Sequence, residues 1–173
     1  ENGKRVKIGL VKNINQFDPW RRWHLLDWII SNSVNHFYND STIVFLRTGI
    51  FRIRIPGLAW LFHKNLKAIG STDFFGLNYY SHNHLKMQYS FQEPFSMQYP
   101  DKDTMTDMPY TIYGEGIYRA IKSVSVLDVP ILITENGVAD AEDNRRELYI
   151  KRYLYAVSRA IEDGFNISGY FYW

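Results

Sequence analysis

The sequence of 173 residues contains no cysteine, and this absence excludes disulfide bonds, thiolate metal sites and a cysteine nucleophile. A chain without cysteine also favours a reducing compartment, so we expect a cytoplasmic protein. No apolar run approaches the length of a membrane span, and the first residues do not resemble a signal peptide, so no membrane partner is expected. The chain begins without methionine and ends at Trp173 within an apolar run, which predicts that both ends are cut.

Strong charge of either sign is lacking as well. The net charge is +2, from 20 Lys and Arg against 18 Asp and Glu, and the cations are dispersed, so no nucleic-acid partner is expected. Hydrophobic residues make up 46% and charged residues 22%, a composition typical of globular proteins. Aromatic residues are abundant at 17%. Tyr and Trp combine an apolar face with a polar tip and so suit a polar ligand with flat apolar patches, such as a sugar, although large cores also use them.

Residues 130–137 form a short apolar run that stops at one carboxylate, Glu135. The run shows no alternation, which predicts a strand buried on both faces, as in parallel sheets covered by helices. Asn136 and Gly137 are interpreted as a turn, because both tolerate a positive φ. Glu135 is then either a tunable carboxylate at the rim of the core or a solvated side chain beside a turn. This stretch alone does not decide between the two.

Strand and helix patterns alternate along the chain. Strands are predicted at 6–11, 73–80, 130–135 and 167–173. Apolar residues at helical spacing predict helices between them, namely from Asp18–Pro19 to Phe37, at 58–69 closed by Gly70, at 117–127, and at 150–161 ending at Gly164. The stretch 41–56 is either an irregular connection or a short extra hairpin. The polar stretch 81–109 is predicted to be a long functional loop.

This order implies a parallel sheet with right-handed crossovers, either an open doubly wound sheet or part of a (β/α)8 barrel. The first predicted strand is not followed by a glycine-rich phosphate turn, which removes the usual support for a nucleotide-binding open sheet. In a barrel, the residues at the carboxyl ends of the strands form the site. Here these residues are Asn13, Asn78, Tyr80, Glu135 and Trp173.

The segments "FFGLNYYS", "ILITENGVAD" and "GYFYW" occur in that order with helices between them, and "IGLVKNI" and "IYGEGIYRAIK" flank the first of them. Together they resemble the C-terminal half of glycoside hydrolase family 1, the retaining β-glucosidase family. The resemblance covers the whole chain. It implies that residues 1–173 are a partial catalytic domain containing strands five to eight of a (β/α)8 TIM barrel, about four strand–helix units of an α/β fold, with the last helix missing.

The resemblance also implies roles for individual residues. Glu135 would be the catalytic nucleophile that attacks the anomeric carbon, and Tyr80 would donate a hydrogen bond to its carboxylate and favour the ionised form. Asn78 would line the site, and Trp173 would stack on the bound sugar. The reaction would need no cofactor and no metal. His82 and His84 are interpreted as loop or substrate-proximal residues and not as metal ligands, because no further Cys or carboxylate ligands stand at a suitable spacing.

A retaining glycosidase also needs a second carboxyl group roughly 5 Å from the first. In the family this group lies in an "NEP" motif, which the sequence does not contain; Glu93–Pro94 follows Gln92 within the long loop and is rejected. The family segment "SLLDNFEW" is absent too, and the family's usual Trp and Pro are replaced by Tyr110 and Gly114.

Two hypotheses therefore follow from the sequence. The first is a fragment of a retaining β-glycosidase that acts on a small-molecule or oligosaccharide β-glycoside and is inactive alone. The second is a natural half-barrel without its own catalysis, which serves as a carbohydrate-binding or assembly module. Its partner would be the missing N-terminal half-barrel or a second copy, because half a barrel leaves sheet edges unpaired.

Overall fold

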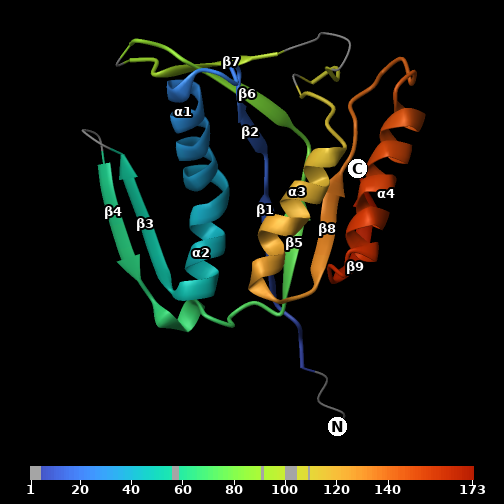
Figure 1. Cartoon of the computed structure of the whole chain (residues 1–173). Coiled ribbons are helices and arrows are strands. Elements are labelled where there is room, and N and C mark those ends of the chain that lie inside the picture. Colours follow the sequence, from blue (N-terminus) through green and yellow to red (C-terminus); the bar gives the residue numbers. More distant parts are fainter. Residues whose placement is uncertain (1–4, 56–58, 91, 100–104, 109) are drawn as a thin grey trace.

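The fold is built around a parallel sheet whose strand order follows the chain (Figure 1). The computed structural model describes residues 5–55, 59–90, 92–99, 105–108 and 110–173. The sheet contains β1 (Gly9–Asn13), β5 (Phe74–Asn78), β8 (Ile131–Asn136) and β9 (Ile167–Tyr172). These strands lie within the four predicted strand segments, apart from the last two residues of β1 and the last residue of β8.

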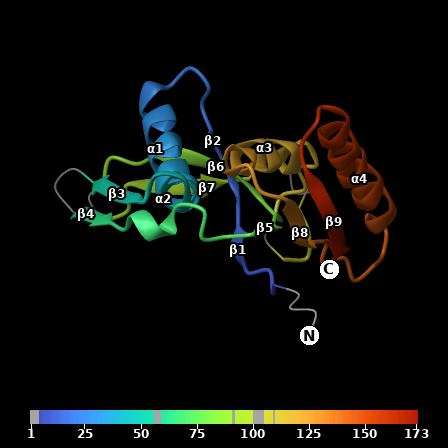
Figure 2. The same ribbon diagram turned by 90° about the horizontal axis from the view of Figure 1, so that it is seen from below.

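Helices connect the strands on one side of the sheet. They are α1 (Leu25–Asn35), which continues through a π-helical turn (His36–Asp40) into α2 (Ser41–Thr48), then α3 (Glu115–Val124) with a 3₁₀ turn (Ser125–Leu127), and α4 (Arg146–Glu162). Seen from below, α1, α3 and α4 lie along the same side of the sheet (Figure 2). A doubly wound sheet would reverse its strand order and carry helices on both faces. The observed arrangement is therefore that of a partial (β/α) barrel.

The main hydrophobic core lies between the sheet and helices α3 and α4. It includes Phe75, Leu77, Ile131 and Ile133 from the strands and Ile117, Ile121, Tyr149 and Tyr153 from the helices. Burial of each such aliphatic or aromatic side chain contributes about 1.5–3 kcal/mol to the free energy of folding, relative to leaving it exposed to water. In β8, Ile131 and Ile133 are buried, whereas Leu132 and Thr134 are half-buried. The predicted burial of both faces is thus correct only for the helix-covered face, because Leu132 and Thr134 face the other way.

The predicted helix at 58–69 is wrong. Within the described residues this stretch contains β4 (Ala59–Lys64) and a 3₁₀ turn (Leu66–Ala68), and β4 pairs antiparallel with β3 (Ile50–Ile55). The stretch 41–56, expected to be an irregular connection or a hairpin of its own, instead contains α2 and only the first strand of the hairpin, β3. The strands of this hairpin are rich in aromatic and β-branched residues, whose preference for extended backbone outweighed a helical spacing that a short apolar run can imitate.

The predicted helix start at Asp18–Pro19 is also wrong, because both residues lie in β2 (Gln16–Pro19). This strand pairs with β6 (His82–Met87), which pairs with β7 (Phe95–Gln98), so the predicted long loop contains two strands. This second sheet lies beyond the carboxyl ends of the main strands (Figure 1). The Asp18 carboxylate binds the side chains of other elements and does not cap a helix.

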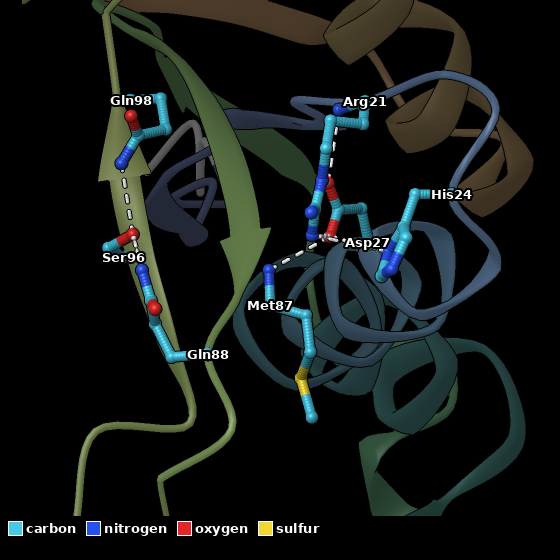
Figure 3. Close-up of polar contacts among 7 residues, drawn as sticks. All are labelled: Arg21, His24, Asp27, Met87, Gln88, Ser96 and Gln98. Carbon is cyan, nitrogen blue, oxygen red and sulfur yellow. Dashed lines mark hydrogen bonds and ion pairs between the residues drawn. The ribbon is translucent and has the colours of Figure 1, made fainter.

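A buried carboxylate joins α1 to β6 (Figure 3). The Asp27 side chain is 0% exposed and accepts hydrogen bonds from Arg21 Nε at 2.8 Å, Arg21 Nη2 at 2.7 Å and the Met87 amide at 2.9 Å. The His24 ring nitrogen Nδ1 lies 3.0 Å from the same carboxylate. The hydrogen bonds from Arg21 hold the pKa of Asp27 well below its usual range, against the opposing effect of burial. Asp27 therefore holds the second sheet against the helix.

A smaller side-chain ladder lies on the same sheet. The Ser96 hydroxyl of β7 accepts hydrogen bonds from the side-chain amides of Gln88 at 2.7 Å and Gln98 at 2.9 Å (Figure 3).

Among the helices of the described residues, none is both long enough and apolar enough to cross a membrane.

Candidate active site

Polar residues from neighbouring strands meet at the carboxyl edge of the main sheet. Asn13 pairs with Asn78 across β1 and β5, and Asn78 pairs with Glu135 across β5 and β8. The Tyr79 amide donates to the Glu135 carbonyl at 3.0 Å, which extends the ladder past the end of β5. The parallel register thus brings together residues that are far apart in the sequence.

Tyr80 contacts the Glu135 side chain directly. Its hydroxyl donates to Glu135 Oε2 at 2.9 Å. Burial and this hydrogen bond raise the pKa of Tyr80 well above its usual value of 10.0, so the hydroxyl remains protonated at neutral pH. The Tyr110 ring centroid lies 6.0 Å from that of Tyr80 and extends the aromatic wall beside the carboxylate. The carboxylate is therefore oriented by a donor that does not titrate in the neutral range.

Asn78 is held by the neighbouring strand. Its side-chain oxygen Oδ1 accepts a hydrogen bond from the Thr134 hydroxyl at 2.5 Å, and its carbonyl accepts from the Ile14 amide at 2.9 Å. The bond from Thr134 orients the side chain of Asn78 and leaves its Nδ2 as the donating end, whereas the bond from Ile14 holds its backbone. Asn78 is half-buried and contributes to the same edge of the sheet as Glu135.

Asn136 and Gly137 do not form the expected turn, because neither has a positive φ. Asn136 is the last residue of β8 and is 0% exposed. A Cβ atom at Gly137 would lie 1.9 Å from the Trp173 carbonyl oxygen, so glycine is required here for close backbone approach. The Trp173 amide donates to the Asn136 carbonyl at 2.9 Å, and Trp173 is 76% exposed.

A cleft of about 450 Å³ opens beside Glu135. Its lining residues are Tyr80, Met108, Tyr110, Glu135, Gly137, Val138, Ala139, Arg146 and Trp173. Tyr80, Glu135 and Trp173 were predicted as site residues, whereas Asn13 and Asn78 lie at the same sheet edge but do not line this cleft. Tyr110 was expected only as a departure from the family, and Met108 and Arg146 were not predicted, because these loop and helix-start positions carry no local pattern. Glu135 is the one carboxylate among the lining residues that the structure describes.

A second, larger cavity of about 650 Å³ shares Tyr110 with this cleft. Its walls include Ile30 and Val34 from α1 and Phe37 from the π-helical turn. These apolar residues border the cavity, whereas the buried residues of α1 are the polar Asp27 and Ser31. The aromatic surface near Glu135 is therefore more extensive than the cleft alone.

His82 and His84 lie on β6, and neither lines the Glu135 cleft. His82 Nε2 lies 2.8 Å from Asp18 Oδ2, and the Arg119 guanidinium donates to both Asp18 oxygens at 2.6 and 2.9 Å. Burial alone would raise the pKa of Asp18, but hydrogen bonds from His82 and Arg119 hold it well below its usual range. In the described part of the chain, no group of three or more His, Cys, Asp or Glu residues could hold a metal ion.

Comparison with known proteins places this site in context. The chain is 35% identical over 195 residues to the 1,4-beta-D-glucan glucohydrolase of Thermotoga neapolitana, with 100% of this chain and 44% of that protein covered. It is 34% identical to beta-glucosidase A of Thermotoga maritima, of which it covers 42%. The chain thus spans less than half the length of these relatives.

Solved structures show the same fold. The beta-glycosidase from Pyrococcus horikoshii matches 96% of this chain and 38% of its own, with a TM-score of 0.82 and 30% identity. A Thermotoga maritima family 1 glycoside hydrolase, complexed with a cyclophellitol analogue transition state mimic, matches 98% of this chain and 42% of its own, with a TM-score of 0.78 and 25% identity. Both support the partial barrel.

The sequence profile described as glycosyl hydrolase family 1 matches residues 21–173, which include every segment of the site except Asn13. The chain therefore belongs to glycosyl hydrolase family 1.

Proposed function

We propose that this chain carries the nucleophile half of the active site of a retaining β-glycosidase, with Glu135 as the nucleophile. The observation that carries the proposal is the Glu135 carboxylate at a strand end, in a cleft, with the Tyr80 hydroxyl 2.9 Å from Oε2. Catalytic residues of (β/α)8 barrels lie at the carboxyl ends of strands. Membership of family 1 and the names of the relatives support a β-glycoside as the substrate.

The proposed reaction is a double displacement. A Glu135 oxygen attacks the anomeric carbon and forms an ester to the sugar, while the bond from that carbon to the aglycone oxygen breaks. A second carboxyl group gives its proton to the departing oxygen. It then accepts a proton from water, whose oxygen attacks the anomeric carbon and releases Glu135. Asn78 would bind a sugar hydroxyl through Nδ2, and Trp173 would pack against the apolar face of the ring.

The described cleft supplies Glu135 but no second carboxylate. Retaining enzymes place the two carboxyl groups about 5–5.5 Å apart. The general acid would then come from a part of the protein other than these residues, and the chain alone is expected to hydrolyse substrates with poor leaving groups about 100-fold more slowly or worse. This arrangement favours a fragment whose activity needs the complementary part of the barrel.

A second candidate function is that of a carbohydrate-binding or assembly module without its own catalysis. It is favoured by the same solitary carboxylate and by the order of the described sheet, in which β1 and β9 each pair with one neighbour only. Such a module would bind a β-glycoside near Trp173 without releasing sugar. Release of free sugar from a β-glycoside therefore distinguishes the glycosidase from the binding module.

The test is the stereochemistry of hydrolysis. The protein expressed from its complete coding sequence is mixed with 4-nitrophenyl β-glucoside, and the first sugar anomer released is identified by proton NMR. Double displacement at Glu135 predicts the β anomer first, followed by mutarotation. First release of the α anomer would refute the retaining mechanism, and binding without hydrolysis would favour the module.

Removal of the Tyr80 hydroxyl is expected to weaken catalysis without abolishing it. The substitution Tyr80→Phe deletes the donor to Glu135 Oε2 and keeps the ring. A hydrogen bond to a charged group is worth about 1.5–3 kcal/mol, so kcat/KM should fall roughly 10- to 150-fold. Steady-state kinetics measure the effect. Tyr118→Phe, which removes a hydroxyl bonded to Asp163 away from the cleft, serves as the control; equal kinetics for the two variants would contradict the role of Tyr80.

A further inference from the structure

The side-chain amide of Asn136, the residue after Glu135, is held on three sides. Asn136 is 0% exposed. Its Nδ2 donates to the Tyr79 carbonyl at 2.6 Å and to the Tyr149 hydroxyl at 2.9 Å, and the Tyr170 hydroxyl donates to Oδ1 at 2.7 Å. Both donors and one acceptor position of this buried amide are thus satisfied within the protein. We name Asn136, Tyr149 and Tyr170 the amide clamp.

The clamp connects the elements that surround the candidate nucleophile. Tyr79 follows β5, Tyr149 lies in α4, and Tyr170 lies in β9. The backbone of the same segment is held too, because the Glu135 carbonyl accepts from the Tyr79 amide and the Asn136 carbonyl accepts from the Trp173 amide. The position of Asn136 is therefore linked to both the Glu135 and the Trp173 backbones.

The strand pairing next to Glu135 is irregular on both sides of β8. Against β9, Ile133 pairs with Tyr170 and Asn136 pairs with Tyr172, so three steps along β8 oppose two steps along β9. Against β5, Ile133 pairs with Leu77 and Glu135 pairs with Asn78, so two steps oppose one. Such bulges change the direction of a side chain and are frequent beside active sites. Against β9, the pair that follows the bulge is that of Asn136 with Tyr172, so the clamp holds β8 directly after the irregular step.

We infer that the amide clamp positions the Glu135 carboxylate. The hydrogen bonds of Tyr149 and Tyr170 fix the Asn136 amide, and Asn136 in turn sets the direction of the Glu135 side chain. This inference rests on the proposed function of Glu135. The hydroxyls of Tyr149 and Tyr170 do not touch the reacting atoms; they act through the Asn136 amide and the bulged backbone. Loss of one hydroxyl should let the carboxylate deviate from the line of attack, and a displacement near 1 Å costs about 100-fold in rate.

Tyr153 provides a matched control that distinguishes a positioning role of the clamp from a purely structural role. Tyr153 stacks on Tyr149 with ring centroids 3.9 Å apart and an interplanar angle of 17°. Both side chains are at most 1% exposed. The Tyr153 hydroxyl accepts from the Tyr113 amide at 3.0 Å and also interacts with the Tyr149 hydroxyl, but no hydrogen bond among the described residues joins it to Asn136. Tyr149→Phe and Tyr153→Phe therefore each remove one buried hydroxyl from the same core, but only the first removes a hydrogen bond to Asn136.

The experiment measures kcat, KM and the unfolding midpoint for Tyr149→Phe, Tyr170→Phe and Tyr153→Phe in the protein from its complete coding sequence. We expect the two clamp variants to lose roughly 10-fold in kcat with KM changed less than about 2-fold, because ground-state binding remains. Tyr153→Phe should lose similar thermal stability and keep its kcat. The double clamp variant should lose less than the product of the single losses, because both hydroxyls act on one amide.

Unchanged kcat in the clamp variants, or an equal loss of kcat in Tyr153→Phe, would overturn the positioning role while leaving the proposed function intact. A wild-type protein that hydrolyses no β-glycoside would overturn the proposed function and the role of the clamp with it. The two failures are therefore distinguished by the activity of the unmodified protein in the same assay.

Discussion

Replacement of Glu135 by alanine is expected to lower kcat for β-glycoside hydrolysis by roughly 10⁴-fold or more, the scale seen when a covalent nucleophile is removed. The physical reason is that no other carboxylate lines the described cleft, so nothing there can take over the attack on the anomeric carbon. Steady-state rates with 4-nitrophenyl β-glucoside, measured on the protein from its complete coding sequence, give the loss.

The same variant offers a positive test. Truncation of Glu135 to alanine leaves space beside the anomeric carbon that a small anion such as azide can enter. Azide would attack from the face that the carboxylate had occupied, so the product should be the α-glycosyl azide. Glu135→Gln, which fills this space, serves as the matched control and should not be rescued. Recovery of activity in both variants, or in neither, would contradict the assignment of Glu135.

Replacement of Asp27 by asparagine is expected to cost about 3 kcal/mol in the free energy of unfolding. The Asp27 carboxylate is fully buried, and its removal would leave the Arg21 guanidinium, whose side chain is 23% exposed, without a counter-charge. Breaking a buried ion pair on one side typically costs 3–5 kcal/mol, and the partial exposure of Arg21 favours the lower end of that range. Chemical denaturation at neutral pH measures the difference.

The effect of Asp27 should depend on pH in a defined direction. Because its pKa is depressed in the folded protein, its contribution is fully present above the ordinary pKa near 3.8 and is lost as the pH falls through the folded value. The gap in unfolding free energy between wild type and Asp27→Asn should therefore narrow from pH 7 toward pH 3. Glu115→Gln, which removes an exposed ion pair with Arg152, is the control and should cost less than about 1 kcal/mol. A gap independent of pH would contradict the depressed pKa.

The parts of the fold that the sequence predicts correctly are those with long local patterns. The four parallel strands follow from apolar and β-branched runs, the helices α3 and α4 follow from apolar residues at helical spacing, and the position of Glu135 near the end of β8 follows from where its apolar run stops. The strand β4 was mistaken for a helix because Leu61, Phe62 and Leu66 have a spacing that also fits a helix. Asp18–Pro19 resembles a helix start, but tertiary ion pairing with Arg119 decided its structure.

The site itself was predictable only in part. Tyr80 was identified through a family resemblance, and the structure shows it within hydrogen-bond distance of Glu135. Asn136 was predicted to be a turn residue because the residue type shows which backbone conformations it can adopt. It does not show which side chains will pack around Asn136 in the folded protein. Its true surroundings are Tyr149 and Tyr170, from later elements, and only the three-dimensional arrangement brings them together. Met108 and Arg146 reach the cleft for the same reason.

The covalent bond between Glu135 and the sugar is tested most directly by trapping the glycosyl-enzyme ester. A 2-deoxy-2-fluoro β-glucoside with a good leaving group should label the protein from its complete coding sequence, because the fluorine slows hydrolysis of the ester more than departure of an activated aglycone. Digestion and mass spectrometry then locate the label. We expect one fluorosugar on the peptide that contains Glu135, and a label on any other residue would contradict the assignment of Glu135 as the nucleophile.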